Sequence, residues 1–143
     1  MLALAAGLAV GAAGCSPLVR REVRFVMPAR PATETSPLNL EKFHVIGAKT
    51  CPPGPVEEPH ATGNDSAALY FKAEPVQGGF DTLIAFRGRH CAVRALGWYD
   101  SNGDGVLNAG DYQGTTAVID AVDRGVFRGN ITRAPDLTLT LVP

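Results

Sequence analysis

The sequence lacks an excess of charge of either sign. Its 143 residues include 13 lysines and arginines against 14 aspartates and glutamates, which leaves a formal net charge of −1. A protein that binds nucleic acid through a broad phosphate-attracting face needs a clear basic excess, so no nucleic-acid partner is expected. Hydrophobic residues make up 45% of the chain. This proportion excludes wholesale disorder, which needs low hydrophobicity and a high net charge.

The apolar run at the start of the sequence is too short to span a membrane. Residues 1–14 carry no charge and would form about 21 Å of helix, whereas the hydrocarbon core of a bilayer is about 30 Å thick. The length suits the apolar centre of a secretory signal peptide instead. The small residues Ala12, Ala13 and Gly14 lead directly into Cys15.

This junction resembles the lipobox of bacterial lipoproteins, in which small residues precede a cysteine that is acylated and becomes the new N-terminus. The resemblance implies a signal peptide at 1–14 and lipidation of Cys15. It also implies export to the bacterial cell envelope, where the lipid would anchor the chain to a membrane at the periplasmic face or the cell surface. The alternative interpretation is an apolar N-terminal helix or strand that contains a cysteine by chance.

Cysteine is scarce, with three in the chain. If Cys15 carries lipid, Cys51 and Cys91 remain, and such a pair in an exported protein is expected to form a disulfide. Closing that loop of forty residues would contribute roughly 4 kcal/mol in the chain-entropy model. The alternative is two free thiols. A Cys–His nucleophile at His90 and Cys91 is not expected, because adjacent residues of a strand point to opposite faces.

Helical periodicity is missing from the chain. No window of twelve residues shows a helical stripe, while 16 glycines and 11 prolines favour many turns. Short strands at regular spacing predict an all-β fold, an antiparallel sandwich or barrel, of which we expect the β-sandwich. The spacing of 80–86 and 90–99 predicts a hairpin. The predicted strands are 22–27, 42–46, 67–73, 80–86, 90–99, 115–122, 125–131 and 137–142.

The prolines and the predicted strands divide the chain into three parts. Residues 1–14 form the signal peptide, and 15–40 form a tether that leads into the domain and contains the first short strand. Residues 41–143 form the sandwich. Within it, closely spaced prolines exclude regular structure over 51–65, because proline lacks the backbone donor and fixes φ.

One loop carries a metal-binding pattern. Residues 100–111 fit the calcium-loop pattern D-x-[DN]-x-[DN]-G-x5-[DE], with a glycine at position 6 for the sharp turn. All the candidate ligand atoms are oxygens, which favours Ca²⁺ over zinc or copper. The predicted ligands are the side chains of Asp100, Asn102, Asp104, Asn108 and Asp111 and the backbone carbonyl of Val106. The alternative is an Asp/Asn/Gly-rich turn without a metal, held by hydrogen bonds of its own side chains.

The flanks of this loop favour strands. Gly97 precedes it, and Gly114 and several β-branched residues follow it, which disfavours the two helices of an EF-hand. The loop is also single, whereas EF-hands normally pair and dockerins carry two loops, each followed by a helix. A dockerin-like or EF-hand interaction module is therefore the less favoured alternative.

The run from Cys91 to Gly114 resembles the calcium-loop segment of transthyretin-like (prealbumin-like) and related Ig-like sandwich domains of bacterial exported proteins. In these domains a strand with an aromatic or aliphatic end runs into D-x-N-x-D-G and then into a Gly-Asp pair before the next strand. Trp98-Tyr99 and Gly110-Asp111 occupy those places here, and 137–141 looks like the closing strand. The resemblance implies an Ig-like sandwich with one EF-hand-type calcium loop between strands.

Other candidate residues carry little chemistry. His44 and His60 lack a partner at metal-ligand spacing. Trp98 and Tyr99 could stack on a sugar, but such aromatics more often fill the core of a sandwich. Asn130 begins a formal glycosylation sequon, which has little weight in a bacterial lipoprotein.

The expected function follows from these observations together. No nucleophile, phosphate-binding loop or Ser/His/Asp set stands at a supporting spacing, so the protein is not expected to be an enzyme. The sequence predicts a calcium-binding exported lipoprotein that acts as a non-catalytic binding or structural module at the cell envelope. Its protein or carbohydrate ligand is left open. The alternative is an accessory lipoprotein with no metal in the loop.

Overall fold

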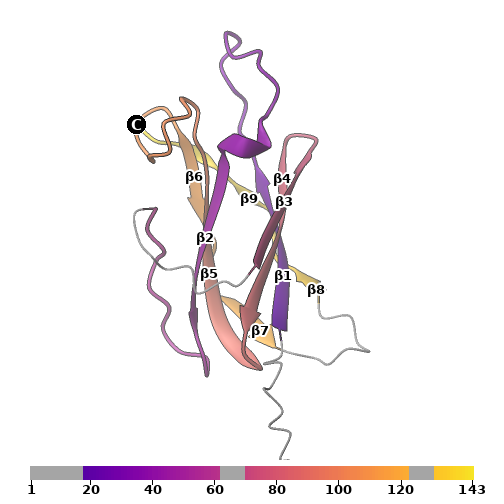
Figure 1. The fold of residues 1–143 in the computed structure, drawn as a ribbon. Coiled ribbons are helices and arrows are strands. Elements are labelled where there is room, and N and C mark those ends of the chain that lie inside the picture. The colour runs from indigo at the N-terminus through magenta and orange to yellow at the C-terminus, as the bar shows by residue number, and fades with distance from the viewer. Residues whose placement is uncertain (1–17, 62–69, 123–130) are drawn as a thin grey trace, which may run out of the picture.

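Ten short strands form two sheets in residues 18–61, 70–122 and 131–143, the parts of the chain that the computed structural model describes (Figure 1). Most strand pairs are antiparallel and the two sheets enclose one apolar core, so the predicted β-sandwich is confirmed. The one helix in these ranges is a 3-10 turn, η1 (Leu40–Lys42). No helix there is long and apolar enough to cross a membrane.

Sheet A is centred on its first strand, β1. The strand order is β3–β4–β1–β8, and β9 lies beside β1 further along the same edge. The pairs of β4 with β1 and β3 are antiparallel, whereas β8 and β9 run parallel to β1, which the antiparallel prediction did not include. The strands of sheet A are β1 (Leu18–Val26), β3 (Tyr70–Val76), β4 (Gly79–Arg87), β8 (Ile131–Arg133) and β9 (Leu137–Thr138).

Sheet B is built around its longest strand, β5. On one side β5 pairs with β2, and on the other it pairs first with β7 and then with β6. The last strand, β10, closes the edge beside β6. The strands of sheet B are β2 (Phe43–Thr50), β5 (His90–Tyr99), β6 (Tyr112–Thr115), β7 (Ile119–Val122) and β10 (Thr140–Leu141).

Several predicted strands match the observed ones. The segment 90–99 is β5. The predicted hairpin of 80–86 with 90–99 is wrong, because β4 pairs with β1 and β3 in sheet A, whereas β5 pairs with β2, β6 and β7 in sheet B. The short turn between them therefore crosses from one sheet to the other. The prediction of one continuous strand at 115–122 is wrong, because Thr116 interrupts it. The Thr116 N–H bonds to the Ala95 carbonyl at 2.8 Å, and the Thr116 hydroxyl accepts from the Ala95 N–H at 3.0 Å, which ends the regular ladder. Most of the predicted strand 125–131 lies outside the described residues.

The C-terminal strand also departs from its prediction. The segment 137–142 is broken at Leu139, where the chain crosses from sheet A to sheet B. The Leu139 N–H still bonds to the Val26 carbonyl at 2.8 Å, and its side chain is completely buried between the sheets. Burial of this side chain at the crossing holds the two sheets together at their C-terminal edge.

The chain joins the sandwich earlier than a tether over 15–40 implies. The strand expected at 22–27 is the longer β1, and it lies in the middle of sheet A. Val23, Phe25 and Met27 are buried on one face, as their alternation predicts. Residues 27–39 then form an irregular loop at one end of the molecule, at the top of Figure 1.

Aromatic side chains from four strands fill the centre of the core. The ring of Phe43 stacks on that of Phe80 with centroids 4.3 Å apart, and it also contacts Phe25 at 5.4 Å. Tyr99 lies 5.8 Å from Phe80. Opposite them Gly97 leaves room for Phe25, since a Cβ at this position would lie 2.6 Å from two carbons of the Phe25 ring.

The predicted disulfide is present. Cys51 and Cys91 are bonded, with their Cα atoms 4.4 Å apart, so the alternative of two free thiols is wrong. Cys91 is completely buried in the core. The bond attaches the proline-rich segment 51–61, which is irregular as predicted, to the central strand of sheet B.

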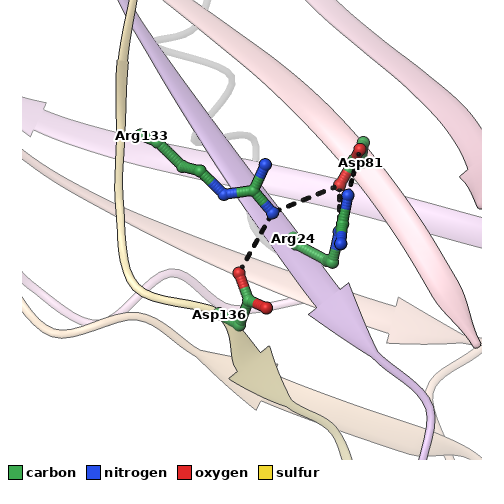
Figure 2. A network of polar contacts seen from close by, with 4 residues as sticks. All are labelled: Arg24, Asp81, Arg133 and Asp136. Atoms are coloured by element: carbon green, nitrogen blue, oxygen red, sulfur yellow. Dashed lines mark hydrogen bonds and ion pairs between the residues drawn. The ribbon is translucent and has the colours of Figure 1, made fainter.

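A network of charged side chains crosses the outer face of sheet A (Figure 2). Arg24 on β1 makes two bonds to Asp81 on β4, at 2.6 and 2.8 Å. Arg133 at the end of β8 lies 4.0 Å from Asp81 and 3.2 Å from Asp136. The network therefore links β4, β1 and the turn between β8 and β9.

Candidate metal site in the loop 100–111

The loop 100–111 joins β5 to β6 at the end of the sandwich opposite the β4–β5 turn (Figure 1). Both flanks are strands, as predicted, so the loop is not part of a helix–loop–helix EF-hand. Tyr99 and Tyr112 pair directly across the sheet and hold the two ends of the loop together. The first and last candidate ligands, Asp100 and Asp111, are 2% and 0% exposed.

Glycines allow the chain to reverse direction within this short loop. Gly105, at position 6 of the calcium pattern, has φ +78°, and Gly103 and Gly110 also have positive φ, at 76° and 95°. Residues with a Cβ rarely adopt this left-handed conformation. The glycine predicted from the pattern therefore has the conformational role expected of it.

The two end carboxylates bind the backbone of the loop. Asp100 accepts the N–H groups of Gly103 and Gly105, one on each oxygen, both at 2.7 Å. Asp111 accepts the N–H groups of Ser101 at 2.8 Å and Asn108 at 3.0 Å. These four bonds compensate the burial of two carboxylates, which would otherwise be costly.

Three side chains meet in the exposed middle of the loop. The Asn108 amide donates to Asp104 at 2.7 Å, and the Asn102 amide contacts Asp104 at 3.2 Å and Asn108 at 3.3 Å. The pKa of Asp104 is lowered, first by the Val106 N–H that its carboxylate accepts and then by these amides. Asp104 is therefore a stable anion at neutral pH.

The structure brings some of the predicted ligands together and holds others apart. Asn102, Asp104 and Asn108 are in mutual contact, whereas Asp100 and Asp111 are turned to backbone N–H groups. Among the described residues, no group of three His, Cys, Asp or Glu side chains is arranged to hold a metal ion.

The chemistry of the donors fits Ca²⁺, which prefers oxygen ligands. The fit requires a local change, because amide nitrogen rather than amide oxygen faces Asp104. Rotation of the Asn108 amide by half a turn would place its oxygen beside the Asp104 carboxylate, since the two ends of an amide have nearly the same shape. Each end carboxylate uses one lone pair per oxygen on an N–H group and keeps others available.

Contacts from outside the loop attach it to two other parts of the fold. The Asp100 N–H bonds to the Lys42 carbonyl at 2.8 Å, and the Lys42 ammonium donates to the Ser101 carbonyl at 2.9 Å. Val142 bonds to the loop twice, as an acceptor from the Gly110 N–H and as a donor to the Asp111 carbonyl. Sequence reasoning missed Lys42 and Val142, because backbone contacts between distant segments leave no local pattern.

An open hollow lies beside the loop, between the segment 28–31 and the C-terminal strand. It has a volume of about 590 Å³, and its lining includes Tyr112, Leu139 and Leu141. Tyr112 follows the last candidate ligand directly in sequence. The loop is therefore joined to the wall of this hollow by one peptide bond.

The remaining candidate residues have structural surroundings. His44 stacks on Trp98 with ring centroids 4.7 Å apart, and His90 pairs with Asp120. Trp98 and Tyr99 are 6% and 5% exposed, so neither offers a free face to a sugar. His60 is exposed in the irregular segment 51–61. Cys15 and Asn130 lie outside the described residues.

In comparisons with known proteins, no family model, curated protein or solved structure matches this chain.

Proposed function

We propose that this chain is a calcium-binding lipoprotein of the bacterial cell envelope. Its transthyretin-like (Ig-like) sandwich would be a non-catalytic structural or binding module, anchored through lipid on Cys15. The observation that carries the proposal is the loop 100–111, in which a six-position calcium pattern coincides with left-handed glycines and strand flanks. The lipobox-like junction before Cys15 supports the location.

Each candidate ligand has a distinct part in this proposal. Bound calcium would supply the positive charge that draws the oxygen ligands of the loop together. Asp104 is already ionised, and the amides of Asn102 and Asn108 would turn their oxygens inward. The buried carboxylates of Asp100 and Asp111 would close the two ends, with the Val106 carbonyl as the backbone ligand.

The expected effect of the ion is structural. Lys42 and Val142 connect the loop to the start of β2 and to the C-terminus, so ordering the loop would also fix these segments. The hollow beside Tyr112 is the surface whose shape would depend on calcium. A protein or carbohydrate ligand that binds there would therefore bind in a calcium-dependent manner.

Calorimetric titration of the EDTA-treated protein with millimolar Ca²⁺ tests the proposal. We expect a dissociation constant on the order of 10⁻⁴ to 10⁻³ M, or slightly tighter, as in extracellular calcium modules. Saturation at a hundred times that constant would raise the free energy of unfolding by about 2.7 kcal/mol. The absence of both binding heat and a rise in melting temperature would contradict the proposal.

Two variants separate ligation from ordinary loop stability. Asp100→Asn keeps the size of the side chain and one acceptor for the loop N–H groups, but it removes the charge. It should lose most of the calcium-dependent rise in melting temperature. Ser101→Ala changes the neighbouring non-ligand position. It should keep that rise, because Ser101 bonds to Asp111 and Lys42 through its backbone N–H and carbonyl.

The second candidate function is an accessory lipoprotein without a metal. It is favoured by the hydrogen bonds of the loop, in which Asp100, Asn102, Asp104 and Asp111 all accept backbone N–H groups. Such a turn is stable without a cation. The same titration decides between the two functions, because only the first predicts binding heat that Asp100→Asn removes.

A further inference from the structure

We infer that the end of the sandwich formed by the β4–β5 turn, residues 88–89, and the start of β1 lies directly on an anionic membrane surface. The inference rests on the proposed lipid anchor at Cys15. It adds an interaction surface, a partner and an orientation that the anchor alone does not specify.

The distance from the anchor to the fold is short. Only Ser16 and Pro17 separate Cys15 from Leu18, the first residue of β1. An extended chain spans at most about 3.6 Å per residue, so the Cα atoms of Cys15 and Leu18 lie within about 11 Å of each other. No long tether separates the lipid from the sandwich.

The start of β1 identifies the end of the molecule that this short link holds at the membrane. Leu18 pairs with Arg87, the last residue of β4, and the turn that follows leads into β5 at His90. Figure 1 shows this turn and the start of β1 at the same end, opposite the loop 100–111. Within the part of the chain that the structure describes, this end is therefore the one held close to the lipid.

Basic side chains gather at this end, which we name the basic end and define by Arg20, Lys49, Arg87 and Arg89. The three arginines are exposed. Lys49 lies near the end of β2 and donates to the Arg87 carbonyl at 2.8 Å, which places it beside the β4–β5 turn. Asp120 of β7, an acidic residue among those the structure describes at this end, pairs with His90.

Charge and distance together identify the partner. The potential of an anionic membrane decays within a Debye length of about 8 Å at physiological salt. A link of at most about 11 Å holds the basic end within or close to that range, where each lysine or arginine strengthens binding about five-fold. Anionic phospholipid headgroups are therefore the expected partner. The near-neutral chain as a whole, with a net charge of −1, has no comparable general attraction to polyanions.

Vesicle binding tests this inference separately from the lipid anchor. The probe is the full chain with Cys15→Ser, which cannot be lipidated, mixed with vesicles of phosphatidylcholine alone or with about one third phosphatidylglycerol. We expect tighter binding to the anionic vesicles, with the difference lost as salt is raised from about 50 mM to several hundred mM. The apolar N-terminal segment is the same in every variant and contributes a constant background.

A matched pair of single variants locates the surface. Arg87→Gln should weaken binding to anionic vesicles by about five-fold, the effect of one charge. Arg30→Gln removes the same charge at the opposite end and should change binding by less than two-fold. Equal weakening by both variants, or equal binding to neutral and anionic vesicles, would overturn the inference.

The test distinguishes this inference from the proposed function. A lipidated, calcium-binding protein with no preference for anionic vesicles would keep the proposed function and overturn the basic end as a membrane surface. Preferential binding of the Cys15→Ser protein to a nucleic acid or an acidic protein, in place of vesicles, would overturn it as well.

Discussion

Asp111 shows how much one side chain can contribute to a loop. The calcium pattern of EF-hands usually ends in glutamate, and the sequence has the shorter aspartate there. In the structure the Asp111 carboxylate bonds to N–H groups at both the start and the end of the loop, and its backbone holds Val142. The short side chain keeps the carboxylate close to those N–H groups.

Asp81 should make the stability of the fold depend on pH. Its pKa is lowered, mainly by the hydrogen bonds from Arg24, while partial burial acts in the opposite direction and the charges of Arg24 and Arg133 add to the lowering. A carboxyl whose folded pKa lies below its unfolded value of about 3.9 stabilises the fold above that pH. The contribution disappears as the pH falls through the folded pKa.

The variant Arg24→Met tests this dependence. At pH 7 it should lower the melting temperature by no more than about 4 °C, because both side chains are about one third exposed. The difference from the wild type should shrink as the pH falls below about 4. Arg133→Met, whose contact with Asp81 is longer, should show a smaller effect. The same deficit at pH 7 and pH 3 would contradict the assignment.

At the scale of elements, the separation of the two sheets depends on Gly97 in β5. Its backbone lies against the ring of Phe25 on β1, so a single methyl group would enter the closest approach between the sheets. Overpacking of a well-filled core typically costs about 1–3 kcal/mol. Gly97→Ala should lower the free energy of unfolding by that amount in denaturant titrations.

A control and a rescue accompany this prediction. Gly54→Ala places a Cβ 3.4 Å from the Thr50 methyl group, an ordinary contact, and should leave stability nearly unchanged. In a protein that already carries Phe25→Leu, Gly97→Ala should lower the free energy of unfolding by less than it does in the wild type, because the smaller side chain makes room for the added methyl group. A fully stable Gly97→Ala would mean that the sheets can separate freely at this point.

The whole molecule has two ends with different chemistry. β5 contains ten residues and runs from the basic end to the loop 100–111. At about 3.3 Å per residue, the loop lies about 30 Å from the β4–β5 turn. If the basic end lies on the membrane, the loop and the hollow beside it face away from the surface, where ions and ligands reach them freely.

Thiol labelling in reconstituted vesicles tests this orientation. The disulfide and the lipid would occupy all three native cysteines, so an introduced cysteine would be the only reactive thiol. A membrane-impermeant maleimide should label Val106→Cys rapidly, because Val106 is 54% exposed in the outward loop. Arg89→Cys should react several-fold more slowly, and detergent should remove the difference.

Mass spectrometry of the same sample measures the lipid on Cys15. Equal labelling rates in a sample that carries the lipid would contradict the orientation. An unmodified Cys15, or a mature N-terminus elsewhere, would contradict the lipoprotein itself.

Local features were readable from the sequence alone. The extent of β5 and the burial of Val23, Phe25 and Met27 depend on alternation and turn residues, which are properties of neighbours in the chain. The turn after β4 was also readable, but not that it leads into the other sheet. The disulfide followed from the number of cysteines left for pairing. In the loop, the spacing of Asp, Asn and Gly predicted the sharp turn at Gly105, and the glycines and β-branched residues on either side predicted strand flanks.

Contacts between distant segments were decided only by the tertiary structure. No local sequence pattern shows that β1 lies between β4 and β8, or that the chain changes sheet at Leu139. Both arrangements depend on which backbone groups of distant strands are available for pairing. The same holds for the candidate site, where Lys42 and Val142 bind the loop through backbone groups that every residue possesses. The sequence names the side chains of the loop, and the packing of the two sheets determines what those side chains meet.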